Sequence, residues 1–235
     1  MNISNLLARH ARKYPHNIAV ISMGQETTYQ ALNTEANQLA NALQASSISK
    51  GDKVAIYMPN VREFAALYFA IQRIGAIVVP INAKFVTREV EYVLEHSDAK
   101  ALFAHELLME QAKAVQFTGL KVKTGAALEG WQSYGELVDQ TSDEEVCCEL
   151  VEDDDSTLLY TSGTTGNPKG VLLMNRNVLA VSHMIAIEME VKPESRLLIM
   201  MPLTHSAPLN LFFVTAILVG ATAVFTPTFT PDLFI

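Results

Sequence analysis

The residues LLYTSGTTGNPKGVLLMN (158–175) join two apolar runs through a polar segment. The apolar runs, 158–160 and 171–174, are typical of buried strands. The segment 161–170 contains three glycines, four hydroxyl side chains and one cation, Lys169. Backbone N–H groups, hydroxyls and an ammonium group are the donors that bind a polyanion. The stretch therefore predicts a phosphate-binding loop between two strands.

An ordinary loop and a Walker A loop are the two other interpretations of this segment. Clusters of Gly, Ser and Thr are usually ordinary loops, but Gly163 and Gly166 allow the backbone to approach a ligand closely, and Pro168 stiffens the exit. A Walker A loop requires G-x-x-x-x-G-K-[ST] leading into a helix. Here Lys169 is followed by Gly170 and an apolar run typical of a strand. A P-loop kinase or GTPase is therefore disfavoured.

The composition indicates a globular protein, since 49% of the 235 residues are hydrophobic and 18% are charged. The net charge of −8 and the absence of a basic run argue against a nucleic-acid surface. Cys147 and Cys148 are adjacent, which rules out an ordinary bridge between them and gives no metal-ligand spacing. Residues 1–15 lack the apolar region of a signal peptide. These features predict a cytoplasmic protein with reduced thiols.

The segment 197–231 has the length and apolar character of a membrane span. Pro202, Pro208, Gly220 and Pro227 divide it, however, into pieces too short to cross a bilayer as one helix. A strand, a loop, a helix over 208–218 and a strand over 221–225 are predicted instead. No membrane span is expected.

Strand and helix patterns alternate along the first half of the chain. A helix capped by Ser4 is predicted up to Tyr14. Strands are expected over 17–21, 27–29, 54–58, 77–81 and 101–104, and helical spacing appears over 32–43, 62–74 and 87–96. This alternation predicts an α/β fold of mostly parallel sheets flanked by helices.

The pattern weakens from about residue 119 to residue 155. Residues 143–155 hold eight acidic side chains in thirteen positions and no basic one. A solvated linker is favoured over metal binding for such a run. The predicted organisation is a first α/β subdomain over 1–142, an acidic linker over 143–155, and the start of a second α/β subdomain over 156–235. The second subdomain carries the loop, a helix after Asn175 and a strand over 196–201.

The string YTSGTTGNPKG (160–170) resembles the phosphate loop of the acyl-adenylate-forming superfamily. That superfamily includes acyl-CoA synthetases, firefly-type luciferases and peptide-synthetase adenylation domains. Other segments resemble its signatures in the same order: TYQAL (28–32), IGAIVVPIN (74–82) and MPLTHS (201–206). The resemblance covers essentially the whole chain and corresponds to the N-terminal portion of an enzyme similar to fatty-acid–CoA ligases. In the family the large domain continues past this point, and a small mobile domain follows.

The resemblance implies roles for individual residues. Besides contacting the ATP phosphates, Thr161 would bind Mg²⁺, a cation that prefers oxygen ligands. Lys169 would act as a mobile point charge. Taken alone, His205 fits a hydrogen-bonded structural histidine, whereas the resemblance implies a substrate contact between the acyl and thiol pockets. No catalytic residue is assigned, because the family's catalytic lysine lies beyond residue 235. The residues expected to bind the ATP phosphates are Thr161, Ser162, Gly163, Thr164, Thr165, Gly166 and Lys169.

The resemblance implies an ATP-dependent acid–thiol ligase that adenylates a carboxylic acid, of a fatty or otherwise hydrophobic kind, and transfers the acyl group to coenzyme A. Two alternatives stay open: an amino-acid or aryl-acid adenylation domain, and a nucleotide-binding fragment without catalysis. The isolated 235-residue chain is expected to be inactive. It is also expected to self-associate, because a sheet edge and an apolar surface would be uncovered.

Overall fold

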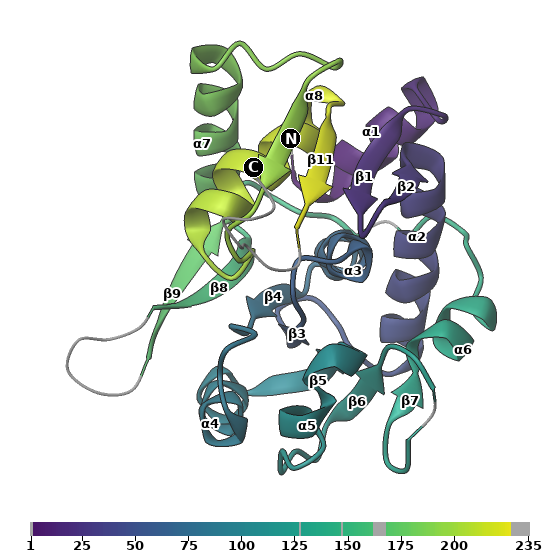
Figure 1. Ribbon diagram of the computed structural model, residues 1–235, viewed down its shortest axis with the longest axis vertical. Coiled ribbons are helices and arrows are strands. Elements are labelled where there is room, and N and C mark those ends of the chain that lie inside the picture. The colour runs from purple at the N-terminus through teal and green to yellow at the C-terminus, as the bar shows by residue number, and fades with distance from the viewer. Residues whose placement is uncertain (1, 127, 147, 162–167, 227–235) are drawn as a thin grey trace.

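A computed structural model describes residues 2–126, 128–146, 148–161 and 168–226 (Figure 1). The strands form two sheets. The larger, seven-stranded sheet has the order β7 (Gln132–Ser133), β6 (Leu120–Lys123), β5 (Ala99–Ala104), β3 (Lys53–Tyr57), β4 (Ile77–Pro80), β8 (Asp155–Thr161) and β9 (Lys169–Met174). All its neighbouring strands are parallel except the antiparallel pair β8–β9.

The smaller sheet combines strands from the two ends of the chain. Its order is β10 (Arg196–Ile199), β11 (Thr222–Phe225), β1 (Ile18–Ser22) and β2 (Gln25–Thr28). The pairs β10–β11 and β11–β1 are parallel, and β1–β2 is an antiparallel hairpin. Each sheet therefore draws strands from both sides of the acidic segment 143–155. The division into subdomains at that segment stays a prediction.

Helices fill the space between the sheets and cover the outer face of the larger one (Figure 1). Helix α3, with its side chains buried on nearly every face, lies between strands of both sheets. Helices α4 and α5 pack on the opposite face of the larger sheet. The helices are α1 (Ser4–Lys13), α2 (Tyr29–Ala45), α3 (Arg62–Arg73), α4 (Thr87–Ser97), α5 (Met109–Ala112), α6 (Tyr134–Asp139), α7 (Asn175–Glu188) and α8 (Val214–Val219), with a 3₁₀ turn η1 (Glu106–Leu108) and a π-helix η2 (Ala207–Phe213).

The predicted class, α/β with mostly parallel sheets flanked by helices, is confirmed. One helix cap and one strand boundary differ from the prediction. Ser4 was predicted to cap α1, but the side chain that accepts from the first turn of this helix is that of Asn2. Its Oδ1 accepts from the Asn5 N–H at 3.2 Å. The predicted strand 27–29 ends one residue earlier, because Thr28 caps α2 by accepting from the Ala31 N–H at 3.1 Å.

Residues 119–155 contain more regular structure than their pattern suggested. Strands β6 and β7 and helix α6 lie there, but each is too short to show a periodicity of its own. The acidic segment and the residue before it are held by their neighbours. Asn41 donates to the carbonyls of Ser142 and Glu144, and Lys50 forms an ion pair of 2.7 Å with Asp154. Cys148 is a free, half-buried thiol, and Cys147 lies outside the described residues.

The apolar C-terminal segment folds as separate short elements, as predicted. Strand β10, the π-helix η2, helix α8 and strand β11 follow one another, and Gly220 ends α8 in the left-handed conformation. The predicted helix over 208–218 is thus a π-helix over its first part. No helix in the part of the chain that the structure describes is long and apolar enough to cross a membrane.

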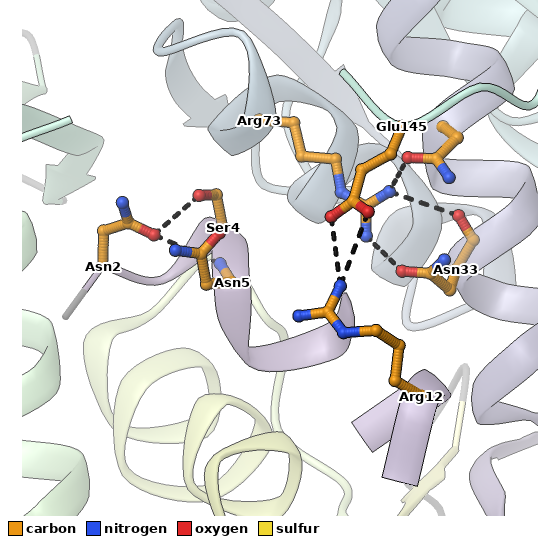
Figure 2. Close-up of polar contacts among 8 residues, drawn as sticks. Asn2, Ser4, Asn5, Arg12, Asn33, Arg73 and Glu145 are labelled. Atoms are coloured by element: carbon orange, nitrogen blue, oxygen red, sulfur yellow. Dashed lines mark hydrogen bonds and ion pairs between the residues drawn. The ribbon is translucent and has the colours of Figure 1, made fainter. Parts of the chain in front are cut away.

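Polar contacts join α3 with α2, and α1 with the acidic segment (Figure 2). Arg73, in the last turn of α3, is buried and donates to the side chains of Asn33 and Asn37 on α2. Arg12 on α1 forms an ion pair of 3.3 Å with Glu145 of the acidic segment. Both side chains of this pair are exposed, so the pair contributes little to stability, about 0–1 kcal/mol.

His10 connects α1 with the end of α8. Its Nε2 lies 3.0 Å from the carbonyl oxygen of Leu218, while its Nδ1 is buried without a hydrogen-bond partner. A Cβ atom at Gly220 would lie 2.8 Å from Nδ1, so only glycine fits there. Burial lowers the pKa of His10; the Leu218 carbonyl opposes this effect, and the charges of Arg9 and Lys13 add to it. Protonation would place an N–H donor at Nδ1 with no acceptor.

The lowered pKa of His10 predicts a loss of stability on acidification. Because the folded state binds its proton more weakly than the unfolded state, stability is lost as pH falls below the unfolded histidine pKa of about 6.5. We expect the melting temperature to fall between pH 7.5 and pH 5.5, and to fall less for His10→Gln. The exposed His16 provides the control, since His16→Gln should keep the wild-type slope. Equal slopes for all three proteins would contradict the assignment to His10.

Candidate functional site

The predicted phosphate loop connects β8 and β9 in the sequence. These two strands pair as a hairpin at one edge of the larger sheet (Figure 1). Both predicted strands are present. Their pairing is antiparallel, with Leu159 opposite Val171, Tyr160 opposite Gly170, and Thr161 opposite Lys169. A Cβ atom at Gly170 would approach Leu158 Cδ1 to 3.0 Å and the Tyr160 ring to 3.4 Å. Glycine at this position therefore lets the two strands pair closely beside that ring.

The last pair of this ladder consists of two residues that the sequence assigned to phosphate binding. Thr161 and Lys169 are both exposed, and the Thr161 hydroxyl donates to the Lys169 carbonyl at a long distance of 3.5 Å. A hydroxyl oxygen and an ammonium group thus emerge from adjacent strands. The hydroxyl suits a hard cation such as Mg²⁺, and the ammonium suits a phosphate oxygen. The other predicted phosphate ligands lie outside the described residues: Ser162, Gly163, Thr164, Thr165 and Gly166.

His205 follows β10 in the other sheet and is exposed. Its backbone N–H donates to the Pro202 carbonyl at 3.1 Å, and its own carbonyl accepts from the Leu209 N–H at 3.2 Å. These bonds place it at the turn that leads into η2. Among the described residues, no hydrogen bond or ion pair joins His205 to Thr161 or Lys169.

Asn60 holds the segment that precedes His205, a role that the sequence analysis did not find. Its side-chain amide, which is buried, donates to the carbonyls of Ile199 and Met201 at 3.2 and 2.9 Å. Its Oδ1 accepts from the Leu203 N–H at 2.9 Å. One side chain from the β3–α3 connection therefore fixes three backbone groups across the gap between the sheets. Because these partners lie about 140 positions away in the sequence, no local pattern reveals them.

The clefts found on the surface lie away from these residues. A cleft of about 560 Å³ is lined by residues of α2 and α6. A second, of about 320 Å³, is lined by the β1–β2 turn and η1. A third, of about 600 Å³, is lined by α4 and the segment after α5. None of the three is lined by Thr161, Lys169 or His205. In the described part of the chain, no group of three or more His, Cys, Asp or Glu side chains is arranged to hold a metal ion. A magnesium site at the hairpin would instead use the Thr161 hydroxyl and phosphate oxygens.

Comparison with known proteins identifies relatives of this chain. The model of the family described as AMP-binding enzyme matches residues 7–234. A long-chain-fatty-acid–CoA ligase of Mycobacterium tuberculosis is 31% identical over 230 residues, which are 97% of this chain and 46% of that protein. A feruloyl-CoA synthase of an Amycolatopsis species is 32% identical over 223 residues, 95% of this chain and 43% of its own length. The chain thus spans less than half the length of these relatives.

Solved structures share the fold. The M. tuberculosis fatty acyl-CoA synthetase superposes with a TM-score of 0.83 at 28% identity, over 97% of this chain and 45% of that one. MatB of Rhodopseudomonas palustris, solved with bound ATP, superposes with a TM-score of 0.85 at 26% identity, over 100% of this chain and 47% of that one. Because the family model matches nearly every residue and the relatives are acyl-CoA ligases, this chain belongs to the family of AMP-binding, acyl-adenylate-forming enzymes and corresponds to their N-terminal portion.

Proposed function

We propose that the whole protein is an ATP-dependent acid–thiol ligase that adenylates a hydrophobic carboxylic acid and transfers the acyl group to coenzyme A. The observation that carries this proposal is the pairing of Thr161 with Lys169 at the end of an exposed hairpin, in the sequence context of the family's phosphate loop. The first step would expel pyrophosphate, so negative charge must be stabilised as it develops on the leaving phosphates. Preorganised N–H groups, hydroxyls and an ammonium group supply this stabilisation.

Each proposed ligand has a distinct task. Lys169 would neutralise the leaving phosphates, and Thr161 would contribute an oxygen to Mg²⁺, which when bound shields the phosphate charges. Ser162, Gly163, Thr164, Thr165 and Gly166 would surround the phosphates. His205 would contact the substrate and take no proton. The ATP bound to the related MatB structure supports the use of ATP.

The class of acid is proposed as fatty or otherwise hydrophobic. One relative is named a long-chain-fatty-acid–CoA ligase and another a feruloyl-CoA synthase, so an aryl acid is the specific alternative. The buried apolar side chains of η2 and α8, which follow His205, favour an apolar substrate, although they also pack the core. We further propose that the protein acts in the cytoplasm.

Substitution of Lys169 tests the phosphate site in the full-length enzyme. We expect Lys169→Ala to slow ATP–pyrophosphate exchange by about 100-fold, the loss typical of one preorganised donor to a developing negative charge. Binding of the carboxylic acid, measured by calorimetry, should change much less. Lys100→Ala is the control, because Lys100 is exposed and forms an ion pair with Asp98 instead. An exchange rate for Lys169→Ala equal to that of the wild type would refute the assignment.

The isolated chain, residues 1–235, is proposed to be inactive. When it is incubated with ATP, Mg²⁺, coenzyme A and a panel of fatty and aryl acids, we expect no thioester above background. Mass spectrometry of the reaction mixture provides the measurement. Detection of an acyl-CoA product would show that this part of the protein suffices for catalysis.

The isolated chain is also proposed to self-associate. Strand β9 is the last strand of the larger sheet, and its Val171 and Leu172 are 45% and 48% exposed. Large apolar side chains are also exposed on α7 and β10 and just after each of them: Met184, Ile187, Met189, Leu198 and Met201. An open sheet edge beside exposed apolar side chains favours pairing with another copy.

Charge introduced on this surface should reduce the association. We expect the mass measured by light scattering at high concentration to exceed that of a monomer, and Val171→Lys with Ile187→Lys to restore the monomer mass. Leu107→Lys serves as the control, because Leu107 is 62% exposed but belongs to η1. A wild-type chain that stays monomeric at high concentration would contradict this proposal.

A further inference from the structure

Helix α4 contacts β8 and the residue just before β9 through aromatic side chains. Tyr160, on β8, is buried among core residues of α4, and its hydroxyl oxygen lies 2.8 Å from Nδ1 of His96. The two rings meet edge to face, with their centroids 5.7 Å apart. Tyr92 stacks on the other side of His96 at 5.4 Å, and its hydroxyl donates to the Pro168 carbonyl at 3.2 Å. Tyr92, His96 and Tyr160 are called here the aromatic cluster.

The two ends of the aromatic cluster meet the hairpin next to the proposed phosphate ligands. Tyr160 directly precedes Thr161, and Pro168 directly precedes Lys169. One hydrogen bond of the cluster is therefore made by the last residue but one of β8, and another by the residue that precedes β9. Since an α-helix packed in a core is a rigid element, these bonds limit how far Thr161 and Lys169 can move relative to each other.

The chemistry of the cluster suits a permanent contact. Burial raises the pKa of Tyr160 to about 12, so its phenol keeps its proton at neutral pH and remains available for the hydrogen bond with His96 Nδ1. Pro168 lies just outside the β8–β9 ladder, and its carbonyl accepts a hydrogen bond from the Tyr92 hydroxyl.

We propose that Tyr92, His96 and Tyr160 are positioning residues for the ATP site, because they fix the separation of the Thr161 hydroxyl and the Lys169 ammonium group. This inference rests on the proposed function of the hairpin and adds three side chains that touch no phosphate themselves. The alternative is that the cluster only packs the core. The two differ in a measurable way: packing survives removal of a hydroxyl, whereas positioning depends on its hydrogen bond.

The test uses the 1–235 chain with Mg²⁺ and ATP, whose binding is followed by the ³¹P chemical shifts of the β and γ phosphates. Tyr160→Phe and Tyr92→Phe should each weaken the affinity by about 3- to 10-fold, the range expected for one hydrogen bond. Hydrogen exchange of the Gly170 amide should become faster in both variants. Tyr57→Phe is the matched control, because its hydroxyl donates to the Phe85 carbonyl at 2.7 Å in the same core without touching the hairpin; its affinity and exchange should equal those of the wild type.

A pair of variants at His96 separates positioning from packing. His96→Asn keeps a polar atom near the position of Nδ1 and should retain most of the affinity. His96→Leu removes the hydrogen bond but keeps an apolar surface for Tyr92, and should lose affinity as Tyr160→Phe does. His96 is exposed, so neither substitution opens a core cavity.

Three outcomes would overturn the proposal. Wild-type affinity in both Tyr160→Phe and Tyr92→Phe would show that the cluster does not position the site. An equal loss in Tyr57→Phe would show a general softening of the core. If the ³¹P shifts of ATP do not respond to added wild-type chain, the ATP site itself is contradicted, and this inference with it. Only this last outcome reaches the proposed function, so the two failures are distinguishable.

Discussion

The antiparallel pairing of β8 with β9 is the constraint on which the candidate site depends. Strand β8 is held on its other side by β4, which lies inside a parallel sheet. The chain leaves this sheet at Thr161 and returns at Lys169, and the register Thr161–Lys169 closes the ladder. The Thr161 and Lys169 side chains therefore lie on neighbouring strands at one edge of the sheet.

The rest of the fold supports that edge from both faces. The helix α3 and the smaller sheet pack on one side of the larger sheet, and α4 and α5 pack on the other. Strands β1 and β11 pair directly, although they lie about 200 residues apart in the sequence. The smaller sheet, which carries His205 after β10, is therefore completed only when both ends of the chain are in place. Asn60 then couples the β10 segment to the start of α3.

Much of the fold could be predicted from the sequence because its signals are local. The sequence TYQAL (28–32) illustrates this: Thr28 caps α2, and the buried Tyr29 donates its hydroxyl to the Ala221 carbonyl at 2.6 Å. The strand before α2 and the helical spacing after it were predicted from residue types, whereas the Thr28 cap and the partner of Tyr29 were not. The neighbours of Gly75 could not be inferred from residue types either. Gly75 has a positive φ of 73°, and a Cβ atom there would lie 2.9 Å from side chains of Lys50 and Leu150. The hairpin strands and the alternation of strands and helices also followed from local pattern.

What the sequence missed depends on distant partners or on very short elements. The strands β6 and β7 gain their order from pairing with β5, not from their own periodicity. Asn60, Tyr92 and His96 look like ordinary polar and aromatic residues until the fold brings them to their acceptors. Of the predicted site, Thr161 and Lys169 lie together and His205 stands apart on the other sheet. The order of strands across each sheet could not be read from the pattern either.

The most direct test of the central claim is a crystal of this chain soaked with ATP and Mg²⁺. The account predicts electron density for the triphosphate at the end of the β8–β9 hairpin, within hydrogen-bonding distance of the Thr161 hydroxyl and the Lys169 ammonium group. Density for the nucleotide at another place, with the hairpin end bearing no phosphate, would contradict it.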